Sequence, residues 1–247
     1  MQCKSCGQDN PPGARFCANC GATLVTVIQP VMKIGVGSAY GNGWRQLWKY
    51  FLELFLIGII GLVIGIPTGM SGWAQGATAA AGVLGFLGFV YSILVNGPVE
   101  YGVAFAYLRA ARGDKLEIKD MFEAFKNYWN AVLASLLVSV IIGIGLVLLI
   151  IPGIIFACKL AFTPYLVVDR KMAVIEAIKE SWRMTGGHAW RVFLIGLLAI
   201  PIFIAGLICF GVGVIISIMW ITLAFASLYH AVAMSEEASG QVKVAPA

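Results

Sequence analysis

Charged side chains are scarce in this chain. Only 12% of its 247 residues are Asp, Glu, Lys or Arg, against about 25% in a typical soluble domain, and 60% are hydrophobic. A single core in water cannot cover that much apolar surface, so we expect lipid to surround most of the chain. The first thirty residues lack an apolar stretch led by basic residues, and we expect no signal peptide.

Catalytic motifs are also missing from the sequence. The two histidines, His188 and His230, lie in different segments, and the chain has no H-E-x-x-H, G-x-S-x-G or phosphate-loop pattern. We therefore expect a protein that is not an enzyme. Two cysteines, Cys158 and Cys209, lie alone in apolar stretches and are interpreted as packing residues.

The other cysteines are Cys3, Cys6, Cys17 and Cys20. They form two C-x-x-C pairs, each followed by glycine and separated by ten residues. Each turn presents two thiolates, and four thiolates make the tetrahedron that structural Zn²⁺ prefers. The alternative is a disulfide pair or a redox C-x-x-C, but a redox motif normally needs a βαβ fold, which is absent. We predict a zinc ribbon whose folding energy comes mostly from the metal.

Composition divides the chain into four predicted regions. The ribbon contains only two basic residues and one acidic residue, too weak an electrostatic footprint to argue for nucleic acid. Glycine is frequent in the segment after it, which predicts flexibility. The regions are a zinc ribbon at 1–24, a flexible linker at 25–43, a six-helix membrane domain at 44–235 and a cytosolic tail at 236–247.

The predicted membrane domain consists of apolar segments separated by proline and glycine. Most segments have the roughly 20 residues that a helix needs to cross a bilayer. The segment 154–168 has 15 residues, so it either crosses or re-enters. Pro98 should kink its segment near Leu94, because proline removes a helical hydrogen bond there. The segments are 50–68, 82–108, 131–151, 154–168, 192–210 and 214–234, with breaks at Pro67-Thr68-Gly69, Pro152-Gly153 and Gly211-Val212-Gly213.

The distribution of positive charge sets the predicted orientation. Sixteen of the seventeen Lys and Arg residues fall before residue 50, in 109–126, in 169–191 or after residue 234. An even number of crossings puts these regions on one side, and the positive-inside rule makes that side the cytoplasm. Thiols also stay reduced there, as zinc binding requires. We predict a multi-pass protein of a bacterial inner membrane with both termini cytoplasmic, and the sequence predicts no oligomeric state.

Three amphipathic stretches precede apolar hairpins, and each contains tryptophan. They begin near Trp44, Ile118 and Met172, with apolar residues at helical spacing opposite Lys and Arg. Such helices lie in the headgroup plane of a membrane. The pattern indicates either a threefold repeat of surface helix plus hairpin or three ordinary helix entries. The predicted interfacial anchors are Trp44, Trp48, Trp129, Trp182, Lys126, Arg183 and Arg191.

Ionisable residues inside the bilayer are candidates for function, because each costs about 2.5–3.5 kcal/mol at mid-helix on insertion scales. Glu100 lies near Asn96 and Pro98, and Lys159 lies in the short segment. These two residues either form an ion pair or lie separately at different depths. Glu53 is near the inner interface, where its carboxylate can reach water.

The middle of the chain contains a set of residues that can be compared with known families: Gly97, Pro98, Phe122, Phe125, Pro152, Gly153, Pro164, Tyr165, Asp169, Glu176, Ala177, Ser181, Trp182, Gly187, His188 and Trp190. In this set the chain resembles an uncharacterised bacterial six-helix membrane family that is related to the membrane domain of some glycerophosphoryl diester phosphodiesterases. The first 21 residues, MQCKSCGQDNPPGARFCANCG, resemble the short zinc ribbons that begin many bacterial membrane proteins. The resemblance implies the architecture but no enzymatic activity, since no stretch here could form the catalytic barrel.

Two functions are compatible with these features. The favoured hypothesis is a non-enzymatic membrane protein whose cytosolic zinc ribbon and basic amphipathic helices dock a protein partner or anionic lipid. The alternative is a transporter or lipid-handling protein with a site around Asn96, Glu100 and Lys159.

Overall fold

A computed structural model of the chain describes residues 6–9, 17–20, 33–73, 79–208 and 212–238. For residues 68–73, 79–81, 84, 212 and 238 it describes the backbone alone. The chain divides into two compact units, Met1–Met32 and Lys33–Ala247.

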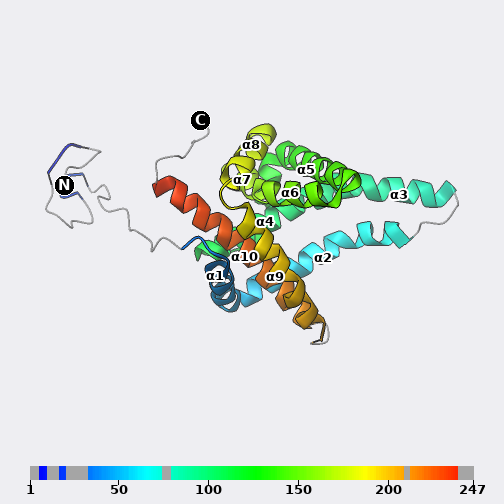
Figure 1. Cartoon of the computed structure of the whole chain (residues 1–247), viewed down its shortest axis with the longest axis horizontal. Helices are drawn as coiled ribbons and strands as arrows, with labels where there is room; N and C mark the ends of the chain where they lie inside the picture. Colours follow the sequence, from blue (N-terminus) through cyan, green and yellow to red (C-terminus); the bar gives the residue numbers. More distant parts are fainter. Residues whose placement is uncertain (1–5, 10–16, 21–32, 74–78, 209–211, 239–247) are drawn as a thin grey trace. The chain divides into compact units, whose positions relative to one another are not determined.

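The larger unit is helical throughout its described regular elements, which confirms the predicted all-α class (Figure 1). Two short elements depart from α geometry, a π-helical segment and a 3-10 helix. In chain order the elements are α1 (Val36–Lys49), α2 (Phe51–Trp73), α3 (Ala79–Tyr91), the π-helix η1 (Ser92–Asn96), α4 (Gly97–Arg112), the 3-10 helix η2 (Ile118–Asn127), α5 (Tyr128–Leu148), α6 (Ile150–Leu160), α7 (Thr163–Asp169), α8 (Val174–Met184), α9 (Ala189–Ile208) and α10 (Val212–Ala238).

Several of these helices are long and apolar enough to cross a membrane. In the described part of the chain there are four such spans, or five if α1 and the 51–67 part of α2, which meet at 94°, count as one. The sequence predicts six. The difference arises at the first hairpin, because α2 has described side chains only to Pro67 and η1 interrupts the helix between α3 and α4. The four spans are Ile118–Leu148, Ile150–Asp169, Ala189–Ile208 and Gly213–Glu237.

Proline does not end helices where the sequence predicts breaks. α2 continues through Pro67 to Trp73, and α6 begins at Ile150, before Pro152. Pro152 is tolerated because it lies in the first turn, where the backbone N–H has no helical partner. The break is one extended residue, Leu149, with φ −163° and ψ 139°. The short segment 154–168 therefore becomes part of a 20-residue candidate span, long enough to cross.

The helix type changes close to Pro98, in the stretch where the sequence predicts a kink. A proline at this position cannot donate to the Leu94 carbonyl, four residues earlier. The chain relaxes into η1 immediately before Pro98, and the Tyr128 hydroxyl donates to the Leu94 oxygen at 2.9 Å. A side chain at the start of α5 thus replaces the missing backbone donor.

The predicted flexible linker is wrong over residues 36–43, which form the first half of α1. Glycine disfavours a helix in isolation, but here it allows α1 to approach α10 closely. A Cβ added at Gly43 would lie 3.3 Å from the Ala224 backbone nitrogen. Beside it, the buried Asn42 side chain donates to the Ala111 carbonyl at 2.9 Å and the Ser227 hydroxyl at 3.0 Å. Tertiary packing therefore outweighs the local propensity.

The core of the unit is built around α4 and α10. α10 packs against α1, α4 and α9, and α4 also contacts η2, α5 and α7. The three expected hairpins are present, with α2 beside α3, α5 beside α6 and α9 beside α10 (Figure 1). Each follows an amphipathic element, α1, η2 or α8. The predicted order of surface helix and hairpin is therefore present in all three places.

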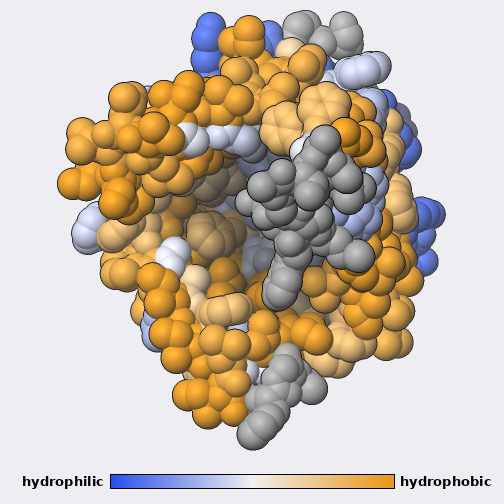
Figure 2. All heavy atoms as spheres, turned by 90° about the vertical axis from the view of Figure 1, so that its right-hand side faces the viewer, coloured by the Kyte–Doolittle hydropathy of each residue, from blue (hydrophilic) through white to orange (hydrophobic). Residues whose placement is uncertain are grey.

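The outer surface of the apolar helices is hydrophobic. Val147, Leu148, Ile150 and Ile208 are each more than two-thirds exposed, and the face drawn in Figure 2 is coloured largely as hydrophobic. Apolar patches of this extent are unfavourable in water and mark contact with lipid or another apolar surface. The helices and their surface together identify a multi-pass membrane protein.

Candidate functional site

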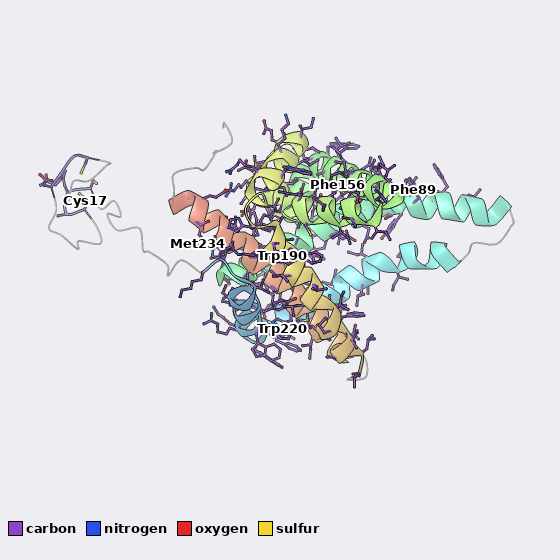
Figure 3. The ribbon with its side chains drawn as sticks, in the orientation of Figure 1. Cys17, Phe89, Phe156, Trp190, Trp220 and Met234 are labelled. Atoms are coloured by element: carbon purple, nitrogen blue, oxygen red, sulfur yellow. The ribbon has the colours of Figure 1, made fainter. Side chains whose placement is uncertain are left out.

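Three of the four predicted zinc ligands gather in the smaller unit. The sulfur atoms of Cys6, Cys17 and Cys20 all lie within 4.8 Å of one another (Figure 3). The Sγ atoms of Cys6 and Cys17 are 3.6 Å apart, and none of the three forms a disulfide. A tetrahedral Zn²⁺ with Zn–S bonds of about 2.3 Å has sulfur–sulfur edges of about 3.8 Å. Cys3, the fourth predicted ligand, lies outside the described residues.

The local backbone explains the gathering of these thiols. Gly7, directly after Cys6, has φ +76°, a left-handed conformation that glycine adopts without strain. The turn directs the Cys6 sulfur back toward Cys17, which is buried while Cys6 and Cys20 are exposed. The arrangement fits a metal that prefers thiolates, and zinc is the metal expected for this donor set.

The predicted tryptophan anchors lie on the surface of the larger unit. Trp44, Trp48, Trp129 and Trp182 are between 42% and 68% exposed. Trp44 also packs on Trp220 of α10, with ring centroids 4.8 Å apart, and Trp220 lies beside α1 in Figure 3. Exposed indole rings next to apolar helices are typical of a membrane interface.

Two of the three predicted cationic anchors are engaged within the protein. Lys126 pairs with Glu123 at 2.7 Å, and Arg183 pairs with Glu180 at 2.6 Å and Glu236 at 3.0 Å. The hydrogen bond to Glu180 is the main cause of a raised pKa of Arg183. Because these carboxylates neutralise the cations, they weaken the expected attraction to anionic lipid.

Arg191, the third cation, lies in the first turn of α9. His188 lies in the turn immediately before that helix. The pKa of His188 is lowered, first by burial and then by the positive charge of Arg191. A lowered pKa favours the neutral form of this histidine near pH 7. Trp190, between the two, is 69% exposed.

A partly buried ion pair at one end of α4 escaped the sequence analysis. Arg112 donates two hydrogen bonds of 2.6 Å to the Asp169 carboxylate, and the Tyr229 hydroxyl donates to the same carboxylate at 3.3 Å. The cluster joins α4, α7 and α10. The only sequence signal was Asp169 among the residues of the family resemblance, since charges that are 57 positions apart have no pattern that links them.

The predicted intramembrane polar residues do not form one site. The Asn96 side chain donates to Glu100 Oε1 at 3.0 Å across one helical turn. Lys159 lies elsewhere, with its Nζ 5.6 Å from the centre of the Trp182 ring. Both residues are described, and they form no ion pair with each other. Of the two interpretations, the separate placement is the one that the structure has.

Asn96 and Glu100 line a groove between α2, α4 and α10. The groove has a volume of about 650 Å³. The remaining lining is almost entirely aliphatic or glycine. Lys159 is not part of it.

Comparison with known proteins supports the two-part organisation. Residues 2–24 match a zinc-ribbon domain family, and residues 124–244 match a family described as a domain of unknown function (DUF7847). The second match begins near the end of η2 and covers α5 to α10. No solved structure shows significant similarity to the chain.

The relatives are mycobacterial proteins. "Uncharacterized protein Rv2560" of Mycobacterium tuberculosis is 29% identical over 166 residues, which are 67% of this chain and 49% of the relative. "Uncharacterized protein Mb2590" of Mycobacterium bovis is similar to the same extent. The chain thus spans about half the length of the curated relatives it matches. It combines a zinc-ribbon segment with a membrane body distantly similar to these proteins.

Proposed function

We propose that this protein is a non-enzymatic membrane scaffold whose cytosolic zinc ribbon docks a protein partner. In this proposal Cys3, Cys6, Cys17 and Cys20 together hold one Zn²⁺. The exposed tryptophans hold the surface helices at the inner face of a bacterial membrane.

The observation that carries this proposal is the set of three clustered thiols in a chain whose other unit is made of apolar helices. A metal-stabilised module of about twenty residues has almost no apolar core, so most of its side chains are on its surface and available to a partner. A protein partner is favoured over anionic lipid, because Lys126 and Arg183 are already paired with carboxylates.

The proposal includes six crossings with both termini in the cytoplasm. The α3–η1–α4 segment would supply the crossing that completes the first hairpin, since α4 ends at Arg112, next to Asp169 at the end of α7. The relation to the membrane domain of the phosphodiesterases also belongs to this proposal, and the residues of the resemblance from Phe125 onward overlap the matched region 124–244.

The test removes the metal without touching the body. In the full chain, Cys6→Ser combined with Cys17→Ser should lower bound zinc, measured by mass spectrometry of the metal, from one ion per chain to none. The chain should stay in the membrane fraction, since the four proposed zinc ligands all precede its helices. In-cell crosslinking should then lose the partner that the unaltered protein captures.

Cys158→Ser is the matched control. This thiol lies in α6, and its removal should leave both zinc and crosslinks unchanged. Identical crosslinks with and without zinc would contradict docking through the ribbon.

A second candidate function, transport or lipid handling, is favoured by the groove that contains Asn96 and Glu100. Its site no longer includes Lys159, which lies beside Trp182. Glu100→Gln should then change the flux of a solute or lipid across reconstituted vesicles, whereas loss of the ribbon should have no effect. Equal flux with both carboxyl and amide at this position would rule this function out.

A further inference from the structure

The groove between α2, α4 and α10 is open along a row of glycines. Gly58, Gly61 and Gly65 of α2 recur at spacings of three and four residues, so they share one face of the helix. A Cβ added at Gly58 would meet nothing within 4 Å, and one at Gly61 would only touch Val103 at 3.9 Å. Because glycine has no side chain, the groove keeps a volume of about 650 Å³, which is enough for an alkyl chain.

Glu100 is the one carboxylic acid among the described residues that line this groove. Glu100 lies on the first turn of α4, and one of its oxygens accepts the hydrogen bond from Asn96. Among the described residues, no Lys, Arg or His lies within ion-pair distance of the carboxylate. A carboxylate at this depth is costly unless a cation or several donors satisfy it, so an apolar wall with a single unpaired acid selects a cationic ligand.

The depth of Glu100 restricts the ligand further. Arg109, near the inner end of α4, lies nine residues beyond it, which corresponds to about 13 Å along a helix. A phospholipid amine would bring its phosphate into the same groove, where the described lining residues include no cation to receive it. Few aromatic rings are available to surround a quaternary ammonium, since Tyr107 is the single aromatic residue among the described lining.

We propose that this groove binds an amphiphile with one protonated primary amine and an alkyl chain but no phosphate. The ammonium donates to the Glu100 carboxylate and the chain lies along the glycine face of α2. This assignment rests on the second candidate function and names its ligand class.

The test uses the full chain in nanodiscs of phosphatidylcholine. The probe is dodecylamine with a diazirine near the end of its chain, and the labelled positions are identified by mass spectrometry after illumination. Labelling should concentrate on α2 and α10. An excess of plain dodecylamine should displace the probe and abolish labelling, whereas an excess of dodecanol, which lacks the charge, should not. Equal displacement by the alcohol would overturn the proposal.

Two variants test the two halves of the site. Glu100→Gln keeps the shape and removes the charge, so labelling should fall about tenfold or more, the effect of losing roughly 1.4 kcal/mol. Gly58→Phe adds a ring at a position where a Cβ would meet nothing within 4 Å, so it should fill the groove and abolish labelling. Undiminished labelling in both variants would place the amine elsewhere.

Each variant has a matched control. Glu53→Gln removes a carboxylate at the start of α2 outside the groove, and Gly143→Phe adds the same ring at an open position on α5. Both controls should keep the labelling. Flux of dodecylamine across vesicles is measured separately. Site-dependent labelling without flux would refute transport and leave the binding site intact, whereas flux unaffected by Glu100→Gln with no labelling would refute the site.

Discussion

The exposure of an ion pair determines how much it contributes to the stability of this protein. The contacts Arg112–Asp169 and Lys119–Glu117 are both 2.6 Å long. The side chains of the first pair are 25% and 13% exposed, and those of the second are 78% and 37% exposed. Water screens the attraction within the second pair, which therefore adds little to stability. The attraction within the first pair is screened much less.

Asp169→Asn should therefore destabilise the fold by about 2 to 4 kcal/mol, because Arg112 is left with an uncompensated and largely buried charge. Thermal unfolding of the purified protein in detergent measures the loss. The matched control is Glu117→Gln, whose midpoint should stay close to that of the unaltered protein. A double variant that also replaces Arg112 with Gln should lose less than the sum of the single losses, since it leaves no unpaired charge.

Close approach of helices depends on which glycines face a neighbour. Along α1, Gly37 and Gly41 meet nothing within 4 Å, whereas Gly43 faces the backbone of Leu223 and Ala224. The adjacent Tyr40 hydroxyl donates to the Ile195 carbonyl at 2.8 Å. α1 is thus an amphipathic helix whose inner side is fixed by both α9 and α10, rather than one that only rests on lipid.

Gly43→Val should push α1 away from α10 and destabilise the unit by about 1 to 3 kcal/mol, the usual effect of overpacking. Gly41→Val, two positions earlier on the exposed face, should change stability by less than about 1 kcal/mol. Unfolding midpoints of the two variants in one detergent provide the comparison. Equal destabilisation would mean that helix propensity, not packing, governs the segment.

Tyr128→Phe should destabilise the protein by about 1 kcal/mol, because the Leu94 carbonyl loses its donor. In a Pro98→Ala background a backbone N–H becomes available to that carbonyl, and the same change should have a smaller effect. The four proteins form a double-mutant cycle that thermal unfolding can measure. Additive losses would show that Tyr128 does not compensate for Pro98.

At the scale of the whole molecule, charge and metal together predict one orientation. The turn after α4 contains exposed Asp114, and the turn between α5 and α6 is reached through Val147, which is 88% exposed and apolar. One candidate span, Ile118–Leu148, separates these two positions, so we expect them to face opposite sides of the membrane. Their accessibility therefore tests the orientation of this span and whether it crosses.

Cysteines introduced at these positions should react differently in intact cells. In a background with both Cys158→Ser and Cys209→Ser, an impermeant maleimide should label Val147→Cys from outside, whereas Asp114→Cys should react only after the membrane is permeabilised. The ribbon thiols should also remain unlabelled from outside. Labelling of Asp114→Cys in intact cells would reverse the orientation and exclude a cytosolic ribbon.

Local chemistry made much of this protein predictable. The spacing of two C-x-x-C pairs predicted the thiol cluster, because each turn brings its own two sulfurs close and one tetrahedral metal needs both pairs together. Hydropathy gave the helical class and the amphipathic elements, since a bilayer leaves a chain few other ways to satisfy its backbone. The missing N–H of proline predicted an irregular helix near Pro98, where the π-helix η1 is found.

The remaining features depend on contacts between distant segments, which local patterns do not encode. A glycine-rich stretch that suggests a linker became the first half of α1 because it packs against α10, where a Cβ at Gly43 would already be a tight contact. The partner of Asp169 lies 57 residues away, and the Glu100 and Lys159 side chains have separate neighbours. Sequence thus determined which segments are apolar, helical or metal-binding, and tertiary structure decided which of their polar groups meet.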